Sequence, residues 1–139
     1  MEFLDFKIQD YKVYLELDRY LTFIKGNSGI GKTLIFKYLR DVIKNPNMIF
    51  INEESNKKLP LKNVINEVKG KIIVIDNADL ILDVDTKKRI IFDGNNQYII
   101  FGKNNTGLWT TELNLAYLKR NDISKKFYLE YPFKNINLK

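Results

Sequence analysis

A repeated change in the spacing of apolar residues constrains this chain more than any other feature. Apolar runs typical of buried strands alternate with segments in which apolar residues recur every three or four positions, as on one face of a helix. The expected strands are residues 20–24, 48–51, 72–75, 98–101 and 127–131, and the expected helices are residues 33–43, 61–68 and 86–92. This order predicts an α/β fold with three layers, in which helices cover a mostly parallel sheet of five strands.

Two further segments, at the N-terminus, alternate between apolar and polar residues. Residues 4–8 and 11–17 show this period of two on either side of a short turn, which predicts an antiparallel hairpin with one wet face. We therefore expect a single domain, since 139 residues suit one compact unit. Its parts are the hairpin (1–18), the core (19–131) and a tail (132–139). Residues 108–119 have no clear period, and we expect a loop and a helix there.

A glycine-rich segment joins the first buried strand to the first helix. It fits the pattern G-x-x-x-x-G-K-[ST] at every fixed position, with the residues Gly26, Asn27, Ser28, Gly29, Ile30, Gly31, Lys32 and Thr33. Glycines let the backbone curl so that successive amides point at a phosphate. Lys32 supplies a mobile positive charge for the phosphates, and Thr33 offers a hydroxyl to Mg²⁺. The pattern predicts a phosphate-binding loop.

A carboxylate ends the third buried strand. Four apolar residues, 72–75, lead directly into Asp76. Ligands of α/β proteins bind at the carboxyl ends of parallel strands, so Asp76 is placed to hold the Mg²⁺ that Thr33 also contacts. We therefore expect Thr33 and Asp76 to be the metal ligands.

The glycine-rich loop resembles Walker A of the P-loop NTPase superfamily, and residues 71–76 resemble Walker B. The interval between Lys32 and Asp76 leaves room for one helix, one strand and one helix, which is similar to the RecA/AAA+ group and unlike ABC-type ATPases. The resemblance covers residues 20–131 and implies a RecA/AAA+-like ATPase core without a lid domain, with ATP and Mg²⁺ as ligands. It also implies a polar sensor after the fourth core strand, at Asn104 or, as a substitute, Asn105.

The catalytic base departs from this resemblance. Those families commonly place Glu directly after the Walker B Asp, whereas here the residue is Asn77, whose amide cannot accept a proton. RecA-like proteins carry their Glu at the end of the strand after the Walker A helix, which implies Glu53 or Glu54 as a catalytic residue beside Lys32. Asp79 is an alternative, and the absence of an effective base is another. We expect hydrolysis to be slow.

The leading functional prediction is a Mg-ATP-binding ATPase of minimal size that couples ATP binding or slow hydrolysis to a macromolecular partner. One alternative is a nucleotide-dependent binding or regulatory module that does not hydrolyse ATP, for which Asn77 is the informative residue. Another is a small-molecule kinase, which uses the same kind of loop. ATP rather than GTP is implied by the family resemblance.

Composition excludes several chemistries and suggests partners. The chain has no Cys and no His, which excludes disulfides, thiolate metal sites and histidine bases. The formal net charge is +6, and residues 101–139 are basic. That region predicts either nucleic-acid contact or a solvated lysine-rich surface. Trp109 is a candidate for base or partner contact, with core packing as the alternative.

An oligomer is a further expectation, in which Arg89 or Arg120 would complete the site of a neighbouring subunit; a solvated basic face is the alternative. The sequence has no apolar run long enough to span a bilayer and no pattern of a signal peptide, so we expect a cytoplasmic protein without a membrane partner.

Overall fold

The computed structural model describes residues 1–108 and 114–133, so Trp109 and most of the expected tail lie outside the described residues. The strands are β1 (Phe3–Ile8), β2 (Tyr11–Glu16), β3 (Leu21–Lys25), β4 (Met48–Ile51), β5 (Ile72–Ile75), β6 (Gln97–Phe101), β7 (Leu115–Asn121) and β8 (Lys126–Glu130). The helices are α1 (Lys32–Tyr38) with its π-helical continuation η1 (Leu39–Ile43), α2 (Glu53–Lys58), α3 (Leu61–Glu67), α4 (Ala78–Ile81) and α5 (Val84–Phe92).

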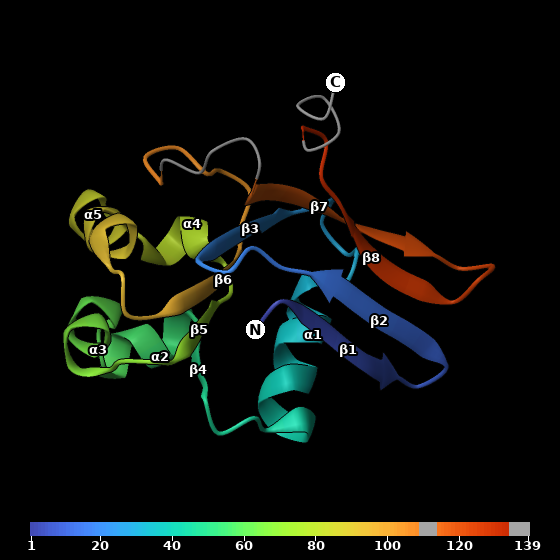
Figure 1. Cartoon of the computed structure of the whole chain (residues 1–139), viewed down its shortest axis with the longest axis horizontal. Coiled ribbons are helices and arrows are strands. Elements are labelled where there is room, and N and C mark those ends of the chain that lie inside the picture. The colour runs from blue at the N-terminus through green and yellow to red at the C-terminus, as the bar shows by residue number, and fades with distance from the viewer. Residues whose placement is uncertain (109–113, 134–139) are drawn as a thin grey trace.

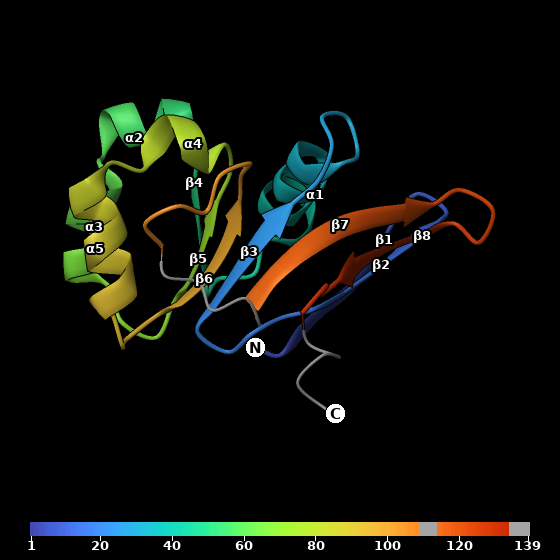
Figure 2. The same ribbon diagram turned by 90° about the horizontal axis from the view of Figure 1, so that it is seen from above.

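All of these strands belong to one sheet. Its eight strands follow the order β1-β2-β8-β7-β3-β6-β5-β4. The pairs β1–β2 and β7–β8 are antiparallel, whereas β2–β8, β7–β3, β3–β6, β6–β5 and β5–β4 are parallel. The sheet curls into a half-barrel around α1, and α2 to α5 lie on the opposite face of the β3–β4 half (Figures 1 and 2).

The predicted fold class is therefore wrong. A mostly parallel five-strand sheet in three layers, with a separate N-terminal hairpin, is replaced by one mixed, curled sheet of eight strands. Two pairings cause the difference. β8 pairs with β7 on one side and with β2 on the other, so the hairpin becomes part of the sheet. β7 itself begins at Leu115, within residues 108–119, where a loop and a helix were expected.

A hydrophobic core lies on each side of the sheet. On the concave side, Ile35, Phe36 and Leu39 of α1 and η1 pack against inward-facing residues of β1, β2 and β8. On the other side, α3, α4 and α5 cover β3, β5 and β6. Burial of apolar area on both faces explains why the central strands read as continuous apolar runs in the sequence.

The local pattern predicts several elements closely. β4 and β5 have the expected bounds, and α3 and α5 agree with their expected helices to within a few residues. The short helices α2 and α4 were not predicted, because each has few residues and buries at most one side chain. Within the described residues, no helix is long and apolar enough to cross a membrane.

Candidate functional site: the loop between β3 and α1

The glycine-rich loop lies at the carboxyl end of β3 and leads straight into α1 (Figure 2). Gly29 and Gly31 have positive φ angles of 83° and 131°, a backbone region that side chains disfavour. A Cβ on Gly31 would also lie 2.8 Å from Cε1 of Phe127 in β8. Asn27, Ser28 and Gly29 are exposed at the tip of the loop, where a ligand can reach the backbone.

Lys32, the first residue of α1, folds back over the loop. Its Nζ donates a hydrogen bond to the carbonyl oxygen of Gly26, the first residue of the loop. Burial lowers the pKa of Lys32, and the nearby charge of Lys103 lowers it further, while Asp76 and Asp79 act in the opposite direction. The positive charges of Lys32 and Lys103 therefore repel each other, and an anionic ligand beside the loop would reduce this repulsion.

The two predicted metal ligands are in contact. The hydroxyl of Thr33 donates to Oδ2 of Asp76 at 3.0 Å, although the residues are far apart in sequence. Asp76 is only 4% exposed, and its backbone N–H donates to the carbonyl oxygen of Ile51 at 3.0 Å, which places the end of β5 beside the end of β4. A hydroxyl and a carboxylate are hard oxygen donors of the kind that Mg²⁺ takes, with phosphate and water oxygens completing its shell. These residues therefore fit Mg²⁺.

Within the described residues there is no group of three or more acidic side chains that could hold a metal by itself. Mg²⁺ usually binds one or two carboxylates together with a phosphate. Thr33 and Asp76 can therefore contribute to a metal site that a bound triphosphate completes, but they do not form a closed cage.

Asn77 lies at the position where the resembled families have a catalytic Glu, and its backbone is left-handed. Its φ is 51° and its ψ is 50°, and the side chain is exposed and does not cap α4. Asn adopts this conformation more readily than other residues with side chains. The backbone turn at the end of β5 thus supplies a structural reason for Asn at this position.

Glu53 and Glu54 lie in the first turn of α2, which begins directly after β4. Asn52 caps this helix, accepting the N–H of Ser55 at 2.9 Å. Both glutamates are exposed, and Glu53 Oε1 lies 3.9 Å from Nζ of Lys57. Neither glutamate has a hydrogen bond or ion pair with Thr33 or Asp76 in this part of the structure. Their carboxylates reach the same edge of the sheet as Asp76 but remain in solvent.

Arg40 of η1 is influenced by the charges of both Glu54 and Asp76. The pKa of Arg40 is raised, chiefly by its hydrogen bond to Asp41 and, more weakly, by the charges of Glu54 and Asp76. Arg40 Nε lies 2.7 Å from Asp41 Oδ1. This guanidinium was not identified from the sequence, because Glu54 and Asp76 are distant from it along the chain.

Asp79, the alternative base, has a structural role. Its carboxylate accepts the backbone N–H groups of Lys103 and Asn104 at 2.9 and 3.0 Å, and so holds the segment that follows β6. Asn104, the predicted sensor, is exposed and uses its Oδ1 to accept the N–H of Thr106 at 2.9 Å. Asn105, its substitute, is half-buried. The structure thus brings Asp79 and Asn104 together at the end of β6.

The two arginines considered for a neighbouring site lie differently. Arg89 pairs with Asp85 one turn earlier on α5, with 3.2 Å between Nε and Oδ2. Arg120 of β7 lies against the loop of its own chain, with Nη1 3.5 Å from the carbonyl oxygen of Ile30. Its Nε lies 3.0 Å from Asp122 Oδ1. Sequence alone could not place Arg120 there, because β7 was not recognised as a strand.

A basic cavity of about 380 Å³ opens beside the loop. Its walls come from the loop, from the segment after β6 and from β7, with the residues Lys25, Gly26, Asn27, Ser28, Ile30, Lys103, Tyr117, Leu118 and Lys119. Three lysines therefore surround a space that adjoins the exposed loop amides. This cavity is large enough for part of a nucleotide and has the charge that its phosphates need.

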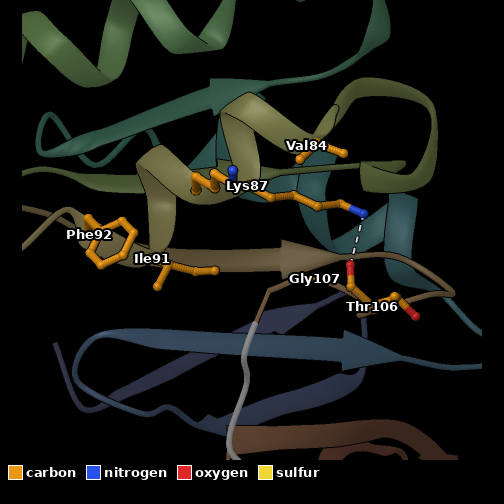
Figure 3. Close-up of a pocket in the computed structure, with 7 residues that line it drawn as sticks. Val84, Lys87, Ile91, Phe92, Thr106 and Gly107 are labelled. Carbon is orange, nitrogen blue, oxygen red and sulfur yellow. Dashed lines mark hydrogen bonds between the residues drawn. The ribbon is translucent and has the colours of Figure 1, made fainter.

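A second cavity, of about 520 Å³, has a different chemistry. It lies between α5 and the segment around Gly107, and its walls are mainly apolar (Figure 3). Lys87 Nζ donates to the carbonyl oxygen of Thr106 at 2.9 Å and so ties α5 to this segment. Lys88 also lines this cavity, beside the apolar side chains of Val84, Ile91 and Phe92.

Comparisons with known proteins find no relative of this chain. No family model matches the chain, and a search of curated proteins finds no match.

Proposed function

We propose that this protein binds Mg·ATP in the loop between β3 and α1, in the manner of a P-loop NTPase, and couples binding or slow hydrolysis to a macromolecular partner. The observation that carries the proposal is the contact between Thr33 and Asp76, which meet at 3.0 Å next to Lys32. A glycine-rich loop, an ammonium group and paired hard oxygens are the parts that Mg·triphosphate binding needs.

Sheet topology supports the location. The chain leaves β3 and builds β4, β5 and β6 on one side of it, then crosses to form β7 on the other side. The strands β3, β6, β5 and β4 form a parallel run, and the carboxyl end of β3 is the point of this run where the strand order changes direction. In parallel sheets with helices on their faces, ligands bind at such points. The glycine-rich loop begins there.

Each residue of the site has a separate task. The amides of Asn27, Ser28, Gly29 and Gly31 would hold phosphate oxygens, and Lys32 would leave Gly26 to contact them. The N–H of Ile30 already donates to the carbonyl oxygen of Asn27 at 3.1 Å. Thr33 and Asp76 would hold Mg²⁺, which bridges and neutralises phosphate oxygens when bound. Lys103 adds positive charge at the same place, as its effect on the pKa of Lys32 indicates.

Calorimetric titration with Mg·ATP tests the proposal. Lys32→Ala should weaken binding at least about tenfold, because it removes the charge that contacts the phosphates. Lys37→Ala is the matched control, since Lys37 lies exposed on the same helix. Asp76→Asn should reduce the gain in affinity that Mg²⁺ confers. Equal binding by the Lys32 and Lys37 variants would refute the proposal.

A second candidate function is a nucleotide-dependent module that does not hydrolyse ATP. It is favoured by the absence of a carboxylate at Asn77 and by the use of Asp79 to hold the segment after β6. Phosphate release by the wild type, and by a Glu53→Gln/Glu54→Gln variant, separates the two functions. Hydrolysis lost in this variant, but retained in the control Glu67→Gln, supports the ATPase; binding without any turnover supports the module.

A further inference from the structure

Half of one sheet face is left without a helix in the described part of the chain. On the face opposite α1, helices α3 to α5 cover β3, β5, β6 and the first residue of β7, Leu115, whereas β1, β2, β8 and the rest of β7 carry no helix (Figure 2). The bare half, called the open face below, carries Phe3, Asp5, Lys7, Lys12, Tyr14, Glu16, Tyr117, Lys119, Lys126, Tyr128 and Glu130. These residues alternate with the buried residues of the concave core.

Lysines form a row across three strands of the open face. Lys7 lies opposite Lys12, and Lys12 lies opposite Lys126. Like charges in directly opposite positions repel one another, so this row is unfavourable in the free protein. An anionic ligand lying across it would relieve the repulsion.

A row of aromatic rings runs beside the lysines. Tyr14 lies opposite Tyr128, which in turn lies opposite Lys119. The two tyrosines are 38% and 42% exposed, and Phe3 stacks on Tyr14 with 5.5 Å between ring centroids. A surface cavity of about 460 Å³ lies along the two strands, lined by Lys12, Tyr14, Lys126, Phe127 and Tyr128.

The open face leads to the nucleotide loop. Tyr117 and Lys119 of β7 belong to this face and also line the basic cavity beside Gly26 and Asn27. Lys119 Nζ lies 5.8 Å from the centroid of the Tyr117 ring. The face also carries three acidic residues, with Asp5 opposite Tyr14, Glu16 opposite Phe3 and Glu130 opposite Tyr117, whereas the lysine row itself contains none.

We propose that the open face binds single-stranded nucleic acid. The lysine row matches a phosphate backbone, and the neighbouring exposed rings provide surfaces on which unpaired bases stack. A duplex cannot use the rings in this way because its bases are already stacked. Single-stranded nucleic acid would then be the macromolecular partner of the proposed Mg·ATP site. Coupling between the two sites rests on the proposed function, whereas binding to the open face does not.

Fluorescence anisotropy with a labelled oligothymidylate of about 20 nucleotides tests this site without any nucleoside triphosphate. Lys12→Gln/Lys126→Gln should weaken binding about tenfold and reduce the slope of log affinity against log salt by about 1.4, because two phosphate contacts are lost. Tyr14→Thr/Tyr128→Thr should weaken binding about tenfold or more and leave the salt slope unchanged.

The matched control is Lys58→Gln/Lys62→Gln, which removes two exposed lysines from α2 and α3 and should change affinity less than about twofold. Circular dichroism checks that each variant folds. Weakening by both open-face variants, with tighter binding of the single strand than of a duplex of equal length, supports the site. The proposal is overturned if the protein binds no oligonucleotide, or if the control variant loses as much affinity as the open-face variants. It is also overturned if the protein binds a duplex independently of the tyrosines, or binds polyglutamate more tightly than the oligonucleotide. Mg·ATP titration of the same preparations shows whether the nucleotide site is intact when oligonucleotide binding fails.

Discussion

At the scale of single residues, Asn77 shows how backbone geometry selects a side chain. Its φ of 51° is tolerated by Asn and Gly but costs other residues free energy. We expect Asn77→Glu to lower the free energy of unfolding by about 1 kcal/mol, and Asn77→Gly to change it little. Urea denaturation measures both variants. Equal stability of the Glu and Asn proteins would contradict the role assigned to the left-handed turn.

Lys32 predicts a pH dependence of ligand binding. Only the ammonium form attracts phosphates, and burial and Lys103 lower the pKa of Lys32. Mg·ATP affinity should therefore fall as the pH rises through this lowered pKa, before an ordinary lysine would lose its proton. Lys103→Gln should move the decline to higher pH, because one cause of the lowered pKa is removed. Calorimetry across the alkaline range checks this; a decline unaffected by Lys103→Gln would argue against the pairing.

At the scale of elements, the loop depends on the strand packed behind it. Gly31→Ala would place a Cβ at a φ of 131° and only 2.8 Å from Cε1 of Phe127 in β8, so it is strained in two ways. We expect it to lower the free energy of unfolding by about 2 kcal/mol and to weaken Mg·ATP binding.

Gly29 and Gly94 provide graded controls for this substitution. Gly29→Ala shares the positive φ but meets no atom within 4 Å, so it should cost less. Gly94→Ala has neither problem and should stay within about 0.5 kcal/mol of the wild type. Chemical denaturation of the three variants gives the order; equal stabilities would show that β8 does not constrain the loop.

The elements also show where local sequence was informative. β5 and Asp76 were predicted closely, because an apolar run ending in a carboxylate is a local pattern. β7 was missed, because one end of it is buried on both faces and the other on only one, so it has no single period. The interactions of Lys103, Arg40 and Arg120 were also missed, because each involves residues far away in the sequence.

At the scale of the whole molecule, Phe127 joins the two halves of the curled sheet. Its ring is buried in the concave core, its centroid lies 5.3 Å from that of the Tyr11 ring, and it occupies the space that a Cβ on Gly31 would need. Phe127→Ala should lower the free energy of unfolding by about 3 kcal/mol and weaken Mg·ATP binding, since the loop loses its support.

Phe92→Ala is the control, because Phe92 is 78% exposed and should contribute little to folding. Thermal and urea denaturation compare the two variants, and titration with Mg·ATP shows the effect on the loop. If Phe127→Ala unfolded the protein outright, Phe127→Leu, with an expected cost of less than about 1.5 kcal/mol, would still report on loop support. Unchanged stability and binding in both Phe127 variants would exclude this coupling.

The sequence by itself determined the glycine-rich loop, its flanking strand and helix, and the carboxylate at the end of β5, because each depends on residues adjacent in the chain. Only the tertiary structure decided that β8 joins the N-terminal hairpin to the sheet, that Asp79 holds Lys103 and Asn104, and that lysines of separate strands form one row. The physical reason is that strand pairing and side-chain contact between distant residues depend on how the whole sheet closes, which local periodicity does not encode.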